Sequence, residues 1–232
     1  MYDHLLFDAD GTLLDFLSSE QSAIENFLLS HHIPITSEVV ASYSRINNDA
    51  WLEFEKGLIT LDQLKVKRFE RFNRLLEIDE NPEESAHTYE NLLSQRGAIY
   101  DDVIETLTLL QAQGYKMSII TNGITHVQKG RLADSGIEHY FATVIISEDI
   151  GVNKPDKEYF TIAQRIITSH GYRCERPLII GDSPTSDLLG GYNSGIDTCY
   201  LNRFNKKVDS SIPYTYEINS LYELAPLLEN ID

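Results

Sequence analysis

Five short apolar runs, one at the start of the chain and four in its second half, have the length of buried strands. They span residues 4–7, 116–120, 143–146, 177–180 and 197–201. Segments with helical spacing of apolar positions lie next to them, at residues 102–113, 125–135, 156–170 and 185–194. Alternating strands and helices are typical of a parallel sheet that helices cover on both faces. The pattern therefore predicts an α/β fold built on a Rossmann-like, doubly wound parallel sheet.

Residues 16–96 break this alternation, because several helical patterns follow one another there with hardly any strand pattern. Thr60 and Gln63 have the spacing of a capping box at the start of a helix. Pro82 and the two acids after it suit the first turn of another helix. We therefore expect a core domain made of residues 1–15 and 97–232, with an all-helical domain of residues 16–96 inserted after the first strand.

The charge of the chain limits its partners. The chain has 232 residues and a formal net charge of −17, which disfavours binding to phosphate backbones or anionic membranes, because that binding depends on clustered Lys and Arg. We expect a small-molecule partner, with no nucleic acid polymer and no membrane. No pattern in the chain specifies an oligomeric state.

The two cysteines and the first residues indicate a cytoplasmic protein. Cys174 and Cys199 have no redox or metal-ligand spacing, which suits a reducing compartment. The chain moves directly from Met1 into an apolar run, without the basic and apolar segments of a targeting signal. No pair of histidines has the helical spacing of a zinc site, so zinc is not expected.

Two acidic residues follow the first apolar run. Asp8 and Asp10 are two positions apart, so both carboxylates can project toward one side as the strand ends. Gly11 then permits a sharp turn and the close approach of an anion. An ordinary acidic turn explains these three residues equally well. The other strand ends decide between a turn and a site.

Polar residues also follow the predicted strands at 116–120 and 143–146. Thr121 and Asn122 stand where a hydroxyl and backbone amides hold phosphate oxygens at the start of a helix, although an ordinary helix cap is the alternative. Lys154 precedes Pro155 and supplies a compact positive charge for a phosphoryl group. Its alternative is a solvated surface lysine.

The run 177–180 is followed by two further acids, Asp182 and Asp187. Mg²⁺ prefers oxygen ligands and usually takes one or two carboxylates, which Asp182 beside Asp8 would provide. Asp187 could orient a metal-bound water or Lys154. A helix cap is the alternative, and it explains Ser183 better than Asp182.

In this order, the four groups of residues resemble the motifs of the haloacid dehalogenase superfamily, over nearly the whole chain. Residues 147–157, 180–201 and 216–224 are especially similar to the pyrimidine-nucleotide 5′-nucleotidase branch. The inserted helices resemble the cap domain of that branch. The resemblance implies a phosphatase, and the presence of Asp10 argues against the metal-free dehalogenases of the superfamily.

The resemblance also implies catalytic roles for individual residues. Asp8 becomes the nucleophile that forms an aspartyl phosphate. Asp10 becomes the general acid and then the general base. Thr121, Asn122 and Lys154 become the phosphate-binding residues.

The implied cofactor is Mg²⁺. Asp8, the carbonyl of Asp10 and Asp182 become its ligands, and Asp187 supports the site from outside the set of ligands. The implied substrate is a phosphate ester, with a nucleoside 5′-monophosphate as the first choice.

Several alternatives share these core residues: a sugar-phosphate or phosphoglycolate phosphatase, a phosphomutase, and a non-catalytic binding module. The helical insertion would decide among the enzymes. Its polar and aromatic residues could contact a base or a sugar, although helical aromatics more often form core. The candidates are Tyr43, Asn47, Trp51 and Phe54.

Overall fold

The computed structural model describes residues 2–207 and 211–231. In this part of the chain a six-stranded sheet has the order β3-β2-β1-β4-β5-β6, and all neighbouring strands are parallel. The strands are β1 (His4–Phe7), β2 (Met117–Thr121), β3 (Thr143–Ile146), β4 (Pro177–Gly181), β5 (Asp197–Leu201) and β6 (Tyr216–Ile218). The five predicted strands are confirmed to within one residue. The edge strand β6 was not predicted, because three residues are too few to show a pattern.

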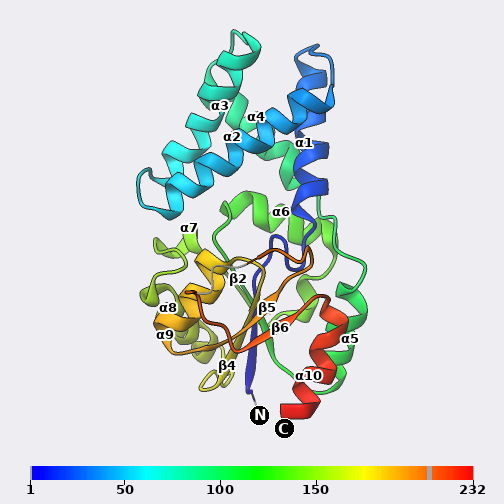
Figure 1. The fold of residues 1–232 in the computed structure, drawn as a ribbon, viewed down its shortest axis with the longest axis vertical. Coiled ribbons are helices and arrows are strands. Elements are labelled where there is room, and N and C mark those ends of the chain that lie inside the picture. The colour runs from blue at the N-terminus through cyan, green and yellow to red at the C-terminus, as the bar shows by residue number, and fades with distance from the viewer. Residues whose placement is uncertain (1, 208–210, 232) are drawn as a thin grey trace.

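Helices cover both faces of the sheet, as the predicted fold class requires (Figure 1). Leu5 and Phe7 of β1 pack in the same cluster as α5 (Val103–Ala112) and α10 (Leu224–Ile231). Leu6 points to the opposite face, where it packs with α8 (Lys157–Ser169). Successive strand residues alternate between faces, so a strand covered on both sides is continuously apolar. This explains why β1 is buried over its whole length.

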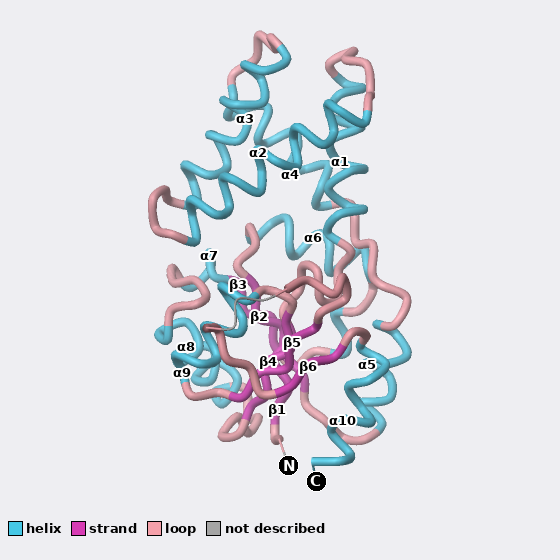
Figure 2. Tube along the Cα trace, in the orientation of Figure 1, coloured by secondary structure: helices cyan, strands magenta, loops and turns pink. Residues whose placement is uncertain are grey.

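Four helices form the upper body of the molecule in Figures 1 and 2. Among the described residues, this body contains no strand. They are α1 (Phe16–Ser30), α2 (Ser37–Glu55), α3 (Leu61–Leu76) and α4 (Pro82–Ser94). The predicted capping box at Thr60 and Gln63 is confirmed at the start of α3. An aromatic cluster, made of Phe27, Tyr43, Phe69, Phe72 and Tyr89, holds the four helices together. The helices form the expected cap over the carboxyl edge of the sheet.

The two chain segments that join cap and core run side by side. The backbone N–H of Asp15 donates to the carbonyl of Ala98 at 2.8 Å, and Leu14 forms a bridge with Ile99. Both segments therefore leave the core at one place. We propose that the cap domain spans residues 16–96 and that residues 1–15 and 97–232 form the core domain.

The remaining elements are short, apart from α6. They are α6 (Thr125–Ser135), the 3₁₀ turn η1 (Glu138–Tyr140), α7 (Ser147–Ile150), the π-helical turn η2 (Pro184–Leu188), α9 (Leu189–Ser194) and the 3₁₀ turn η3 (Leu221–Glu223). The helix predicted at 185–194 is thus a π-helical turn followed by a short α-helix. No helix in the described ranges combines the length and apolarity needed to span a bilayer.

Asp102 ties the start of α5 to the C-terminal segment. Its carboxylate accepts hydrogen bonds from two guanidinium nitrogens of Arg203, at 2.6 and 2.8 Å, and from Ser220 and the backbone of Leu221. Burial alone would raise the pKa of Asp102, but these donors outweigh it and lower the pKa below its usual value. The folded protein therefore favours the ionised form of this side chain.

Replacing Asp102 with Asn should lower the free energy of unfolding by roughly 3 kcal/mol at pH 7, because Arg203 loses its buried partner. A depressed carboxyl pKa contributes stability above the unfolded pKa of about 4, and that stability is lost as the pH falls through the lower folded pKa. The difference between wild type and variant in urea unfolding should therefore shrink on acidification. The exposed neighbour Asp101, changed to Asn, is the matched control. A difference that stays constant with pH would contradict this account.

Candidate active site

The carboxyl ends of the central strands bring the predicted polar residues together. Asp8 follows β1 directly, Thr121 ends β2 and Asp182 follows β4. Strand β1 lies between β2 and β4, so these three positions are at one edge of the sheet. Lys154 reaches the same edge from the segment between α7 and α8. Open α/β sheets bind ligands at this edge.

Lys154 is fully enclosed at the site. Its ammonium donates to Asp8 Oδ1 at 2.7 Å, to Asp187 Oδ1 at 2.7 Å and to the carbonyl of Ile120 at 2.9 Å, and its side chain is 1% exposed. Burial alone would lower the pKa of Lys154, but Asp187 and Asp8 outweigh it and raise the pKa above its usual value. The lysine is therefore a permanent positive charge beside Asp8, and a solvated surface lysine is excluded.

Three carboxylates form a cluster around this lysine. One oxygen from each of Asp8, Asp182 and Asp187 lies within 4.8 Å of the other two. Burial raises the pKa of Asp8 well above its usual value against the opposing effect of Lys154. Burial and the nearby Asp187 raise the pKa of Asp182 to about 7. When all three acids are ionised, Lys154 balances one charge and two negative charges remain. A divalent cation, which prefers oxygen ligands, would balance this remaining charge.

Two glycines allow the carboxylates to come this close. Gly11 has a φ of +85°, and a Cβ atom there would lie 2.6 Å from Asp182 Oδ2. A Cβ atom on Gly181 would collide with Asp187 Oδ2. Any side chain at either position would displace a carboxylate of the cluster. Gly11 is thus needed for two reasons: it permits the turn, and it leaves room for the Asp182 carboxylate.

Asp10 has different partners from Asp8. Arg131 donates to Asp10 Oδ1, and Gln128 Nε2 donates to Asp10 Oδ2 at 2.5 Å, both from α6. The sequence spacing suggested two carboxylates with a shared task on one side of the strand end. Among the described residues, the Asp10 carboxylate is not part of the three-carboxylate cluster. A metal contact from Asp10 would use its backbone carbonyl.

Thr121 and Asn122 shape the start of the segment that leads into α6. The Thr121 hydroxyl accepts hydrogen bonds from the backbone of Gly123 at 3.1 Å and from Gln128 at 3.2 Å. The Asn122 side chain exchanges two hydrogen bonds, each 2.8 Å, with the backbone N–H and carbonyl of Lys154. The Asn122 side chain therefore holds the backbone that carries Lys154.

Comparison with known proteins agrees with this geometry. Residues 5–201 match the model of the family described as haloacid dehalogenase-like hydrolase. The chain belongs to the haloacid dehalogenase-like hydrolases. It is 36% identical to the HAD-hydrolase YfnB of Bacillus subtilis over 98% of this chain and 95% of that protein. A crystal structure of YfnB, solved bound to magnesium, superimposes with a TM-score of 0.90 and covers 98% of each chain.

Two pyrimidine 5′-nucleotidases are similar over the same length. YjjG of Escherichia coli is 32% identical over 98% of both chains. PynA of Streptococcus pneumoniae is 34% identical over 98% of this chain and 95% of that protein. This haloacid dehalogenase-like hydrolase is accordingly a phosphohydrolase of the family, with an acidic cluster that could hold a divalent metal.

The sequence reasoning missed the contacts that α6 makes with the site. Gln128 and Arg131 are both buried, and at a spacing of three residues they lie on one face of α6. Their position just after the Thr121 strand end was the available signal. Nothing in their residue types pointed to Asp10, because a sequence does not specify how a helix is rotated over the sheet.

Contacts between cap and core were missed for the same reason. Lys65 of α3 donates to Glu148 of α7 at 2.5 Å, and the second oxygen of Glu148 accepts the backbone N–H of Thr125 at 2.6 Å. Glu55 at the end of α2 accepts a hydrogen bond from Thr185 at 3.0 Å, two residues before Asp187. The cap of this hydrolase thus touches the loops that carry the site.

The cap residues singled out from the sequence are mostly structural. Tyr43 is fully buried in the aromatic cluster of the cap. Asn47 donates to Glu20 at 2.8 Å and accepts from Arg68 at 3.3 Å, in a buried polar network. Trp51 and Phe54 are partly buried and pack near Ala50, Ile59 and Leu64. The core interpretation therefore holds for Tyr43, and Asn47 acts within the cap.

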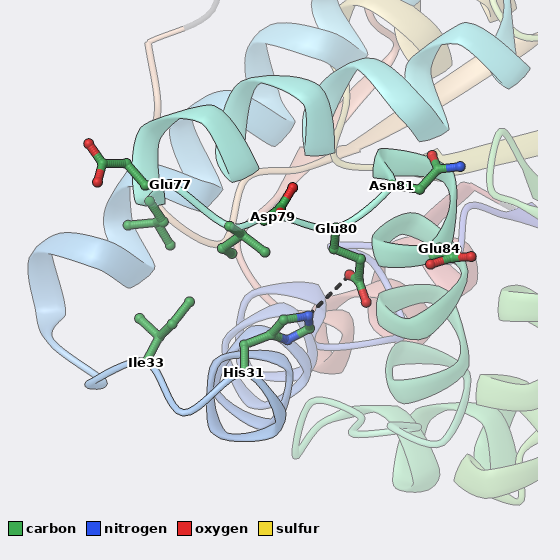
Figure 3. Close-up of a pocket in the computed structure, with 9 residues that line it drawn as sticks. His31, Ile33, Glu77, Asp79, Glu80, Asn81 and Glu84 are labelled. Atoms are coloured by element: carbon green, nitrogen blue, oxygen red, sulfur yellow. Dashed lines mark hydrogen bonds and ion pairs between the residues drawn. The ribbon is translucent and has the colours of Figure 1, made fainter.

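A cavity of about 610 Å³ lies in the cap, lined only by cap residues (Figure 3). Three of its lining residues are His31 and Glu80, which pair at 3.1 Å, and the exposed Asp79. The cavity shares no lining residue with the three-carboxylate cluster of the hydrolase.

Proposed function

We propose that this hydrolase is a Mg²⁺-dependent phosphomonoesterase that acts through an aspartyl phosphate on Asp8, with nucleoside 5′-monophosphates as substrates. One observation carries the proposal. The Asp8 carboxylate stands at the end of the central strand, 2.7 Å from the buried Lys154 ammonium and in a cluster with Asp182 and Asp187. A nucleophile, a fixed positive charge and an oxygen-rich cation site are the parts that phosphoryl transfer needs.

The residues divide the reaction into two steps. In the first, an Asp8 oxygen bonds to phosphorus while the bond from phosphorus to the leaving oxygen breaks, and Asp10 gives that oxygen a proton. In the second, Asp10 takes a proton from water, the water oxygen bonds to phosphorus, and the bond to Asp8 breaks to release phosphate. Lys154 and the backbone amides after Thr121 bind the phosphoryl oxygens in both steps.

The metal ligands in this proposal are the carboxylates of Asp8 and Asp182 and the carbonyl of Asp10. Mg²⁺ held by these groups would neutralise negative charge on the phosphoryl oxygens. Asp187 stays outside the ligand set, because its Oδ1 accepts from Lys154 and its Oδ2 accepts from the backbone of Ser183 at 3.1 Å. Asp187 therefore holds Lys154 in place.

The substrate class is supported by the two pyrimidine 5′-nucleotidases, which are 32% and 34% identical over nearly the whole chain. A sugar-phosphate substrate is the second candidate. It is favoured by the glyceraldehyde 3-phosphate phosphatase of Methanothermobacter thermautotrophicus, 29% identical over 87% of this chain and 86% of that protein. A phosphomutase or a non-catalytic scaffold would retain the same fold.

A substrate panel measured with and without metal tests the proposal. Phosphate release from pyrimidine and purine nucleoside monophosphates, glyceraldehyde 3-phosphate and phosphoglycolate is compared as kcat/KM in Mg²⁺, then in EDTA. We expect pyrimidine nucleotides to exceed the other esters by about tenfold or more, with activity lost in EDTA and restored by excess Mg²⁺. Hydrolysis that EDTA leaves unchanged would remove the metal from the proposal. The absence of hydrolysis of every ester, including p-nitrophenyl phosphate, would favour the scaffold.

A further inference from the structure

Side chains of helix α6 form hydrogen bonds with both oxygens of the Asp10 carboxylate. Arg131 donates to one oxygen, and Gln128 donates to the other at 2.5 Å. The Arg131 side chain is 1% exposed, and Gln128 is equally buried, while the Asp10 side chain is 29% exposed. A buried fork of donors therefore sets the direction of a partly exposed carboxylate.

The position of Gln128 is itself fixed by its surroundings. Its amide nitrogen also donates to the Thr121 hydroxyl at 3.2 Å. A Cβ atom on Gly123 would collide with that nitrogen, so the glycine leaves the space that the amide occupies. Gln128 thus connects the strand end that carries Thr121 to the Asp10 carboxylate through direct hydrogen bonds.

Arg131 also contacts both segments that join cap and core. Its Nε donates to the carbonyl of Arg96 at 3.1 Å, and its guanidinium carbon lies 5.6 Å from the centre of the Phe16 ring. Phe16 begins the first cap helix, and Arg96 lies just after the last one. One guanidinium group therefore touches Asp10 and the two places where the cap begins and ends.

Two glycines let the segment after α4 pack closely against α6. A Cβ atom on Gly97 would collide with the carbonyl of Arg131, and one on Gly130 would lie 2.5 Å from the carbonyl of Ser94. The segment after α4 therefore lies directly on the backbone of α6. A displacement of this segment would be transmitted to Arg131 through backbone contacts as well as through its side chain.

We propose that Arg131 and Gln128 are positioning residues for Asp10, and that Arg131 links the direction of the Asp10 carboxylate to the geometry of the two cap segments. The inference rests on the proposed function, in which Asp10 transfers the proton to the leaving group. Both residues donate to the Asp10 carboxylate, so their effect on proton transfer is exerted through Asp10. A misplacement of about 1 Å is enough to cost on the order of 10²-fold in rate.

The test compares two esters of similar shape that differ in leaving-group basicity, phenyl phosphate and p-nitrophenyl phosphate. Protonation of the leaving group matters more for phenyl phosphate, so a poorly placed acid slows that ester selectively. We expect Arg131→Gln and Gln128→Met to lower kcat/KM for phenyl phosphate about tenfold more than for p-nitrophenyl phosphate. Asp10→Asn should show the same selectivity, and the double variant Asp10→Asn with Arg131→Gln should be no more selective than Asp10→Asn alone.

Controls separate this effect from a loss of folding. Lys129→Gln removes a positive charge from the exposed face of the same helix, where the side chain is 63% exposed, and should leave both esters unaffected. Arg131→Lys keeps a cation near Asp10 and should recover part of the activity on phenyl phosphate that Arg131→Gln loses. If Arg131→Gln does not fold, Gln128→Met carries the test. Equal losses on both esters, or selectivity that adds to that of Asp10→Asn, would overturn the inference.

A structural measurement decides the question independently of activity. Crystal structures of the wild type and of Gln128→Met should differ in the direction of the Asp10 carboxylate, with the three-carboxylate cluster unchanged. An Asp10 carboxylate that keeps its direction in the variant would overturn the positioning role. If the wild type hydrolysed neither of these esters and no ester of the substrate panel, the proposed function would fail, and this comparison would still decide whether α6 positions Asp10.

Discussion

Replacing Asp8 with Asn should abolish phosphate release, with a loss in kcat on the order of 10⁴-fold or more, because the amide cannot form the aspartyl phosphate. The fold should persist. The carbonyl of the new amide side chain can still accept the hydrogen bond from Lys154, and burial already raises the pKa of Asp8 toward the neutral form that an amide imitates. Rapid-quench mass spectrometry of the peptide that contains residue 8 should find the phosphoryl adduct in the wild type and none in the variant.

The matched control for this change is Asp79→Asn. Asp79 is an exposed aspartate at the cap cavity, and that cavity shares no residue with the acidic cluster (Figure 3). The control should retain wild-type kcat and wild-type thermal stability. Full activity in Asp8→Asn would remove Asp8 from its role as nucleophile. A phosphoryl adduct on another residue would move the nucleophile elsewhere.

Replacing Lys154 with Met should lower both activity and stability. The ammonium is the shared partner of Asp8 and Asp187, so its removal leaves three clustered carboxylates without their nearest positive charge. Breaking a buried ion pair in this way costs about 3 kcal/mol of folding free energy or more. The loss of one preorganised positive charge should lower kcat by about 10²- to 10³-fold. Urea unfolding and steady-state kinetics measure the two effects separately.

The stability loss in Lys154→Met should depend on pH. Burial raises the pKa of Asp182 to about 7 in the metal-free protein, whereas an unfolded aspartate titrates at about 4. An acid whose pKa is raised by folding binds its proton more tightly in the folded state, so it costs stability as the pH rises from the unfolded value to the folded one. Without Lys154 this cost should increase. The variant should therefore be closest to the wild type near pH 5 and furthest from it near pH 8.

Two further measurements test the explanation that the charge of Lys154 stabilises the cluster. Lys129→Met, on the exposed face of α6, should unfold like the wild type at each pH. Added Mg²⁺ should restore part of the stability of Lys154→Met, because a cation in the cluster replaces the missing positive charge. A stability loss that is independent of both pH and Mg²⁺ would indicate that Lys154 contributes through packing alone.

The strands and the residues at their ends could be predicted from the sequence because their patterns are local. An apolar run of four or five residues identifies a buried strand, and the polar residue after it lies at the carboxyl edge wherever that strand stands in the sheet. This is why the sequence predicts that Asp8, Thr121 and Asp182 lie at the ends of their strands, where the structure has them. The sequence does not predict the edge strand β6, because the strand is short. It predicts a continuous helix at 185–194, because a π-helical turn has no clear sequence pattern.

For Asp8 and Asp10, the two acids after the first strand, the sequence predicts the position but not the interaction partners. Their spacing of two residues suggested a shared side and a shared task, and this spacing is a property of the chain itself. Their partners come from elements more than a hundred residues away, Lys154 for Asp8 and α6 for Asp10. The rotation of α6 over the sheet and the contact of the cap segments with Arg131 are set by close packing between distant parts of the chain. The sequence by itself determined which residues stand at the edge of the sheet, and only the tertiary structure decided which of them face one another.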